Sequence, residues 1–157
     1  MLIPSDYKEL LSTLNKCGVK YLIVGAYAVI YYTEPRYTKD LEIWVDPEIE
    51  NATKVYEALK QFGAPLKGMT PADFTKPSLL YQIGVEPVRV DILMGISGLD
   101  FNTAWKRRKR VVFEGVDGSV IGIEELMRSK KKANRPMDLV DIGNLSTRLK
   151  ISKKRKK

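Results

Sequence analysis

Three acidic residues stand where strand periodicity could bring their side chains together. Asp40 and Glu42 are separated by one residue, and Asp91 lies in a later apolar segment. Because side chains alternate along a β-strand, Asp40 and Glu42 point to the same face of theirs. Ionised carboxylates so placed repel each other unless a divalent cation that prefers hard oxygen ligands, Mg²⁺ or Mn²⁺, lies between them. The pattern predicts a metal site, although an Asp-x-Glu pair alone is usually only the solvent face of a strand.

A glycine stands ahead of the acids. Gly25 follows an apolar run, residues 21–24, and precedes a short segment expected to be helical. A glycine at such a turn lets the backbone approach a ligand, and the N-terminus of a helix offers free N–H groups and positive potential. Many strand-to-helix turns use glycine for geometry alone. Its position before Asp40 and Glu42 favours a phosphate site beside the metal site.

Composition removes several other chemistries. The chain has no His and a single Cys, Cys17, which excludes catalytic triads that use His, zinc sites built from His and Cys, and an internal disulfide. The formal net charge is +8, with basic runs at 106–110 and 150–157. These runs are either solvated surface or an electrostatic footprint for RNA, DNA or nucleotide.

The elements that must position these residues alternate between helical and strand periodicity. The sequence predicts one α/β (α+β) domain over 1–149, with a mixed β-sheet flanked by helices, and a basic disordered tail over 150–157. Asp46 is expected to cap a helix, and Asp117-Gly118 to turn a hairpin. The expected helices are 5–16, 26–32, 47–62, 101–108, 124–133 and 136–149, and the expected strands are 21–24, 39–45, 79–83, 88–94, 111–113 and 120–123.

The chain is expected to be cytoplasmic and to have no membrane partner. No apolar run reaches the roughly 18 residues that a membrane span needs. Residues 1–4 lack the basic start and the apolar stretch of a signal peptide.

Two motifs carry a resemblance to a known family. Gly25-Ala26, Asp40-x-Glu42 and Asp91 resemble the nucleotidyltransferase fold of the DNA polymerase beta superfamily. The stretch 130–141, in which Lys130 precedes Ala-x-Arg-Pro-x-Asp-Leu-x-Asp, is similar to a C-terminal signature of small bacterial and archaeal members. Some of those members are the toxin halves of abortive-infection systems. The chain departs from the family at Ala26, where Gly or Ser is usual, and at Glu42, where Asp is more frequent.

The resemblance implies an activity and a site. It implies transfer of a nucleoside monophosphate from an NTP to an RNA or protein hydroxyl, with Mg²⁺ (or Mn²⁺) as cofactor and an antitoxin as a partner. The acids Asp40, Glu42 and Asp91 would be both catalytic and metal-binding. The residues implied to bind nucleotide are Gly25, Ala26, Arg36, Thr38 and Lys130.

Lys130 is expected to be exposed on its helix. Asp138 is expected either to add favourable charge at a helix N-terminus or to order Lys130 or Arg135. Two other functional readings stay open. One is a catalytically inactive nucleotidyltransferase-like module that binds nucleic acid or a protein partner through 106–110 and the tail. The other is a plain basic RNA- or DNA-binding domain, for which the chain shows no recognised motif.

Overall fold

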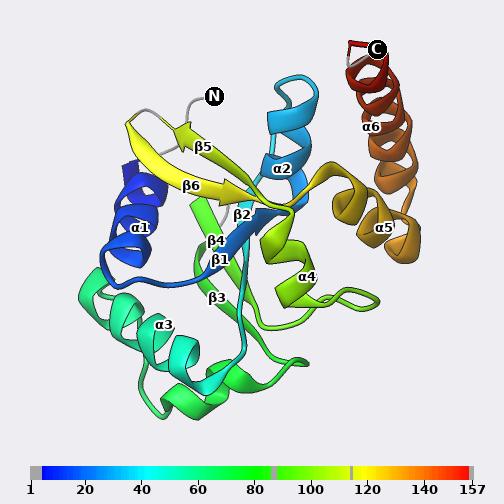
Figure 1. Cartoon of the computed structure of the whole chain (residues 1–157). Helices are drawn as coiled ribbons and strands as arrows, with labels where there is room; N and C mark the ends of the chain where they lie inside the picture. The colour runs from blue at the N-terminus through cyan, green and yellow to red at the C-terminus, as the bar shows by residue number, and fades with distance from the viewer. Residues whose placement is uncertain (1–4, 86–87, 114, 156–157) are drawn as a thin grey trace.

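A mixed six-stranded sheet runs through the computed structural model, which describes residues 5–85, 88–113 and 115–155 (Figure 1). The strand order is β3-β4-β2-β1-β6-β5. β2 is parallel to β4 and β1 is parallel to β6, whereas the other neighbours are antiparallel. The mixed α/β (α+β) architecture is therefore confirmed. The strands are β1 Tyr21–Val24, β2 Asp40–Val45, β3 Leu80–Val85, β4 Val88–Leu93, β5 Lys109–Phe113 and β6 Val116–Val120.

Helices lie on both sides of this sheet (Figure 1). α1 and α3 pack together along one side, while α2 rises from the end of β1 and α5 packs against α6. Across the described residues, no helix combines the length and the apolar character needed to cross a bilayer. The helices are α1 Ser5–Lys16, α2 Gly25–Tyr32, α3 Ile49–Phe62, the 3-10 helix η1 Pro71–Thr75, α4 Phe101–Lys106, α5 Ile123–Ala133 and α6 Pro136–Arg155.

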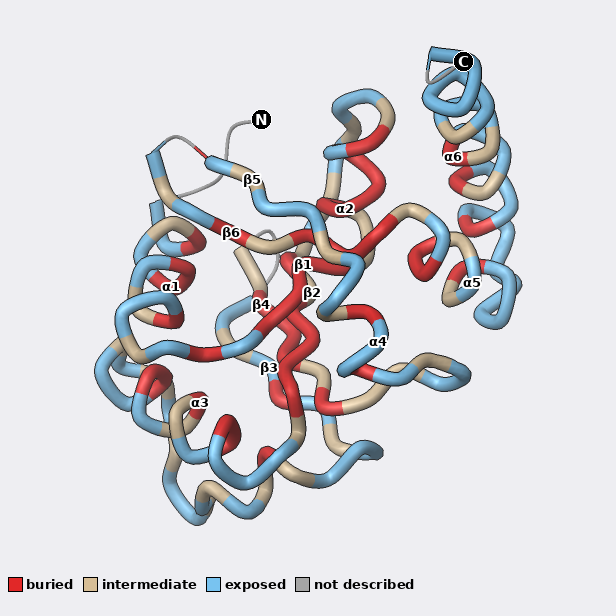
Figure 2. Tube along the Cα trace, viewed as in Figure 1, coloured by how far each residue is buried: buried red, intermediate tan, exposed pale blue. Residues whose placement is uncertain are grey.

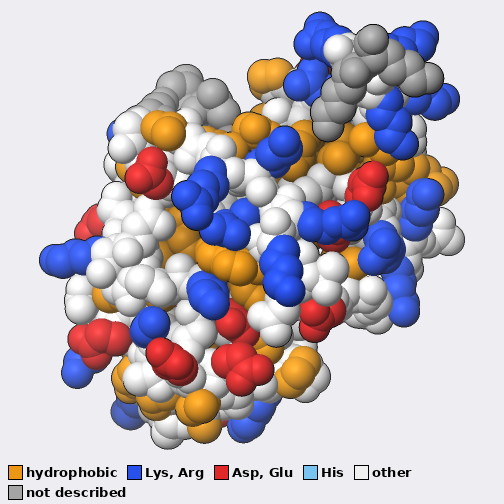
Figure 3. Space-filling view, viewed as in Figure 1, with side chains coloured by type: hydrophobic (Ala, Val, Ile, Leu, Met, Phe, Trp, Pro, Cys, Tyr) orange, Lys and Arg blue, Asp and Glu red, His pale blue; other side chains and the backbone are white. Residues whose placement is uncertain are grey.

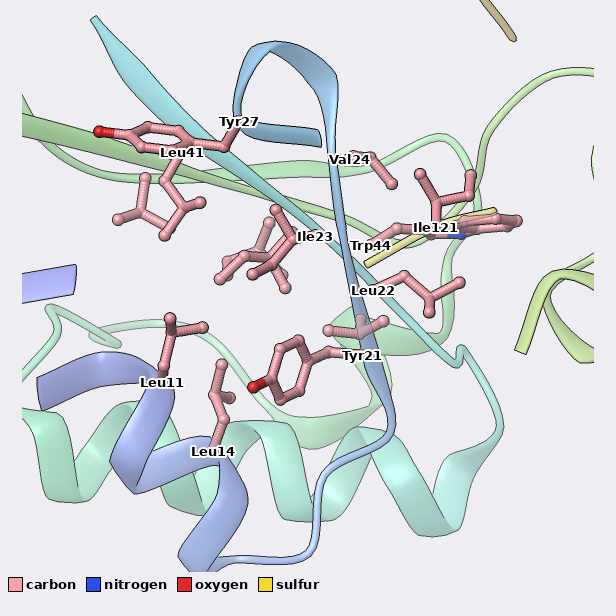
Figure 4. Close-up of a cluster of buried hydrophobic side chains, with 14 of the residues drawn as sticks. Leu11, Leu14, Tyr21, Leu22, Ile23, Val24, Tyr27, Leu41, Trp44 and Ile121 are labelled. Carbon is pink, nitrogen blue, oxygen red and sulfur yellow. The ribbon is translucent and has the colours of Figure 1, made fainter. Parts of the chain in front are cut away.

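The core follows from strand alternation. Buried residues concentrate in the central strands (Figure 2). Leu11 and Leu14 of α1 point toward Tyr21 of β1, whereas Val24, Trp44 and Ile121 gather on the other side (Figure 4). Each fully buried aliphatic side chain contributes about 1.5–3 kcal/mol. The packing on both faces therefore fixes which face each strand residue occupies.

The hairpin of β5 and β6 forms, but its predicted turn is wrong. Asp117 and Gly118 lie inside β6. The chain turns before this strand begins, at Gly115, which has a φ of +87°. Gly118 is buried, and a Cβ there would lie 3.3 Å from the ring of Phe113. This glycine therefore permits the close approach of an aromatic ring.

Two helix boundaries also differ from the prediction. Asp46 does not cap a helix; its Oδ1 accepts a hydrogen bond from the Glu48 backbone N–H at 3.2 Å, and α3 begins two residues beyond Pro47. α6 continues through residues 150–155, which were expected to be disordered. Lys and Arg are good helix formers and interact favourably with the C-terminal end of a helix dipole. Residues 156–157 of the expected tail and residues 1–4 lie outside the described residues.

Candidate active site

Strand register brings the three predicted acids onto one face of the sheet. β4 runs parallel to β2 with Asp91 opposite Glu42 and Arg89 opposite Asp40. Residues that face each other across neighbouring strands point to the same side of a sheet. Asp40, Glu42 and Asp91 therefore lie together, as the alternation predicted. Their catalytic and metal-binding roles stay predictions.

Gly25 lies directly against this group. β1 is antiparallel to β2, so the end of β1 at Val24 stands opposite Glu42, and α2 starts at the next residue. Gly25 has a φ of +67°, and a Cβ built on it would overlap the carboxylate of Glu42. Glycine is needed here for the backbone angle and for the approach of Glu42. Ala26 follows it, half-buried, at the start of the helix.

Arg89 is a member of this group that the sequence did not assign to the site. Its Nη2 donates to Asp40 Oδ2 at 2.8 Å, and its Nε lies 3.5 Å from Asp91 Oδ1. The guanidinium therefore bridges the carboxylates of two adjacent strands. The available signal was its position two residues before Asp91, which puts both side chains on one face of β4.

The carboxylates are held close together at a cost. Burial raises the pKa of Glu42, and the charge of Asp40 raises it further, while Lys130 opposes both. Burial also raises the pKa of Asp91, against the effect of Arg89. Asp91 Oδ1 is buried and accepts no hydrogen bond. Burial is therefore the main reason that the charged forms of both acids are disfavoured, and neighbouring acids add to it.

The carboxylate oxygens of Asp40, Glu42 and Asp91 are hard ligands of the kind that Mg²⁺ or Mn²⁺ prefers. Within the described ranges, no group of three or more acidic side chains has the geometry to hold such an ion. In this arrangement the guanidinium of Arg89 contacts the carboxylates of both Asp40 and Asp91.

A second charged cluster joins α5 to α6. Lys130 Nζ lies 3.1 Å from both Asp138 Oδ1 and Asp141 Oδ2. Arg36 Nη1 donates to Asp141 Oδ1 at 2.8 Å, and Arg135 Nε donates to Asp138 Oδ2 at 2.8 Å. Lys130 is only 7% exposed, so its predicted exposure is wrong. Its helix turns it toward α6, and the alternative in which Asp138 orders Lys130 and Arg135 is confirmed.

The two clusters act on each other electrostatically. Burial would raise the pKa of Asp138, but hydrogen bonds from Arg135 and Lys130 outweigh burial and lower that pKa to about 2. Asp138 is therefore ionised at neutral pH and keeps its cations in place. The charges of Lys130 and Arg135 in turn lower the pKa of Glu42. The α5–α6 cluster thus adds positive potential beside the carboxylates.

The remaining predicted residues have structural partners. Thr38 is half-buried, and its Oγ1 donates to the backbone carbonyl oxygen of Asp40 at 3.2 Å. In the basic run 106–110, Arg107 pairs with Glu125 at 2.8 Å and Arg108 lies 3.7 Å over the ring of Trp105. Lys and Arg side chains are nevertheless widespread on the face shown in Figure 3.

Comparisons of sequence give little on function. No family model matches the chain. It is 36% identical over 69 residues to 2-succinyl-5-enolpyruvyl-6-hydroxy-3-cyclohexene-1-carboxylate synthase from Phocaeicola vulgatus. That match spans 42% of this chain and 12% of the length of the synthase. A likeness over so small a part of the synthase gives this chain no activity.

Comparisons of structure identify the fold. A Thermotoga maritima protein assigned as a nucleotidyltransferase matches with a TM-score of 0.61 and 16% identity, over 86% of this chain and 88% of the other. The lincosamide antibiotic adenylyltransferase LnuA, in its lincomycin-bound structure, matches with a TM-score of 0.60 and 14% identity, over 92% of this chain and 97% of the other. At these identities the likeness shows the fold alone, and this chain has the nucleotidyltransferase fold.

Proposed function

We propose that this chain is a metal-dependent nucleotidyltransferase that moves a nucleoside monophosphate from an NTP to a hydroxyl group of RNA or protein. The observation that carries the proposal is the alignment of Asp40, Glu42 and Asp91 on one sheet face, directly against the turn at Gly25. Residues 130–141 resemble a signature of small bacterial and archaeal members, some of which are abortive-infection toxins, and this likeness extends the proposal to a toxin with an antitoxin partner.

Each part of the site has a proposed role. The carboxylates of Asp40, Glu42 and Asp91 would hold Mg²⁺ or Mn²⁺ through hard oxygen ligands, and Asp91 would assist deprotonation of the acceptor hydroxyl. The start of α2, at Gly25 and Ala26, offers backbone N–H groups to the phosphates of the NTP. The α5–α6 cluster stabilises phosphate charge through Lys130 and the nearby Arg36, and Thr38 fixes the start of β2.

Incubation with labelled NTPs tests this function. Each of the four nucleotides is supplied with Mg²⁺, total RNA and total protein, and incorporation into either acceptor is measured. We expect one NTP to be preferred. Asp40→Asn should lower incorporation about a hundredfold or more, in the range for lost electrostatic stabilisation. Its thermal unfolding should remain cooperative.

Glu57→Gln is the matched control. Glu57 is an exposed acid on α3, on the other side of the sheet, so its removal changes the net charge equally and should leave incorporation unchanged. Absence of incorporation from every NTP, or full incorporation by Asp40→Asn, would contradict the proposed activity.

One observation favours a second candidate, an inactive module of the same fold. Arg89 already neutralises part of the carboxylate charge that a metal would neutralise in an active enzyme. Such a module would bind nucleic acid or a protein through its basic segments. Salt-dependent RNA binding without incorporation of any nucleotide is the result expected for this candidate.

A further inference from the structure

Arg89 stands where a cation is needed among the site carboxylates. We propose that its guanidinium is a built-in counter-ion, that it holds Asp40 and Asp91 in the metal-free protein, and that a divalent cation binds by displacing it. This inference rests on the proposed function, because it concerns the same carboxylates. It makes Arg89 a positioning residue that sets the metal affinity of the site.

The backbone of Arg89 is fixed. β4 is hydrogen-bonded to β2 on one side and to β3 on the other. The hydroxyl of Tyr7, a fully buried residue of α1, also donates to the backbone carbonyl oxygen of Arg89 at 3.1 Å. The guanidinium can therefore leave the carboxylates only by rotation of the side chain.

The side chain of Arg89 is partly open to solvent. It is 27% exposed, whereas the side chain of Asp91 is 9% exposed. An arginine on a partly open face can move its charged end toward water while its aliphatic stem remains on the sheet. For a metal ion to replace the guanidinium, the side chain of Arg89 therefore has to move, whereas Asp91 can remain in place.

In the metal-free protein, Arg89 neutralises only part of the carboxylate charge of the site. One guanidinium bridges the carboxylates of Asp40 and Asp91, whereas no contact from Arg89 to Glu42 accompanies this bridge among the described ion pairs. Lys130 is held by Asp138 and Asp141. Asp91 Oδ1 accepts no hydrogen bond, and its contact with Arg89 Nε is a longer ion pair of 3.5 Å. The site therefore retains oxygens for a divalent ion after Arg89 has satisfied part of the charge.

Mn²⁺ binding, measured by electron paramagnetic resonance without nucleotide, tests the proposal. Arg89→Met removes the cation and keeps an apolar stem. It should bind Mn²⁺ about tenfold more tightly than the unaltered chain, since no charge-assisted hydrogen bond has to be broken. Arg89→Lys keeps a cation but loses the planar bridge, and its affinity should lie between the two.

Arg110→Met is the matched control. Arg110 is exposed on β5, at the opposite edge of the sheet from β3 and β4, and its removal changes the net charge equally. It should bind Mn²⁺ as the unaltered chain does. In EDTA, Arg89→Met should unfold at a lower temperature than the unaltered chain, because its carboxylates have lost their counter-ion. Mn²⁺ should raise the unfolding temperature of Arg89→Met by more than it raises that of the unaltered chain.

Asp40→Asn, alone and combined with Arg89→Met, separates failure of this inference from failure of the proposed function. If Asp40→Asn abolishes Mn²⁺ binding both in the unaltered chain and in Arg89→Met, the ion binds at the carboxylates. If Asp40→Asn abolishes binding but Arg89→Met binds no more tightly than the unaltered chain, the counter-ion role is overturned and the metal site stands. If Asp40→Asn changes binding on neither background, or Arg89→Met binds no Mn²⁺, the metal site and this inference are both overturned.

Discussion

Gly25 connects backbone geometry to the placement of a proposed metal ligand. Its φ of +67° is unfavourable for other residues, and a Cβ at this position would meet the carboxylate of Glu42. We expect Gly25→Ala to lower the free energy of unfolding by about 1–2 kcal/mol, the cost of a left-handed backbone with a side chain. It should also lower nucleotide transfer, because the carboxylate of Glu42 has to move. Chemical denaturation and the labelled-nucleotide assay measure the two effects.

Gly143→Ala is the control for this change. Gly143 lies within α6, and a Cβ at this position would have no neighbour within 4 Å. Because glycine inside a helix loses more backbone entropy on folding than alanine, Gly143→Ala should stabilise the protein by about 0.5–1 kcal/mol. A Gly25→Ala variant that keeps both full stability and full activity would show that Glu42 does not need its present position.

The sequence could predict the acids of the site but neither the cation that bridges them nor the burial of Lys130. Asp40 and Glu42 share a face because of local alternation, which any strand imposes. The bridge from Arg89 to Asp40 depends on the register between β4 and β2, which no local pattern records. Lys130 is followed by two further lysines, and only the direction of α6 decides which of the three is buried.

At the scale of elements, the α5–α6 hairpin depends on Lys130. The helices are joined at Asn134, whose φ is +51°, and the lysine lies between two buried acids of α6. We expect Lys130→Ala to lower the free energy of unfolding by about 3 kcal/mol, the lower end for a broken buried pair, because Arg36 and Arg135 still face those acids. Urea denaturation measures the change.

Two variants isolate the cause of that loss. Lys131→Ala removes a neighbouring exposed lysine and should stay within about 0.5 kcal/mol of the unaltered chain. Lys130→Met keeps most of the side-chain volume, so a loss similar to that of Lys130→Ala assigns the effect to charge. Equal small losses at residues 130 and 131 would contradict a structural role for the buried pair.

The elements themselves were largely predictable, and the errors have local causes. Apolar periodicity placed the strands and helices of the sheet layers because each element buries one face. Asp117-Gly118 has the composition of a turn, yet Gly118 lies within a strand, where a Cβ would be only 3.3 Å from the ring of Phe113 across the hairpin. The end of α6 was placed too early because a run of like charges suggested disorder, whereas lysines at a helix C-terminus are favourable.

At the scale of the whole molecule, positive charge is concentrated at the far end of α6. Beyond Leu145 the helix has no buried residue among those described, and Lys and Arg side chains crowd its end (Figure 3). α6 extends away from the sheet in Figure 1. A basic helix end that stands out from the body can reach a polyanion without moving the candidate active site.

This arrangement predicts that the helix end strengthens RNA binding by neutralising phosphates. Substitution of Lys150, Lys153, Lys154 and Arg155 by Gln removes four charges and retains the helix and Ile151. For each phosphate that is no longer neutralised, the slope of log affinity against log salt should flatten by about 0.7 for single-stranded RNA. NTP binding should be unchanged, because the substituted residues lie beyond the last buried turn of α6. An identical salt slope in the substituted and unaltered chains, measured by fluorescence anisotropy, would mean that the basic end does not touch RNA.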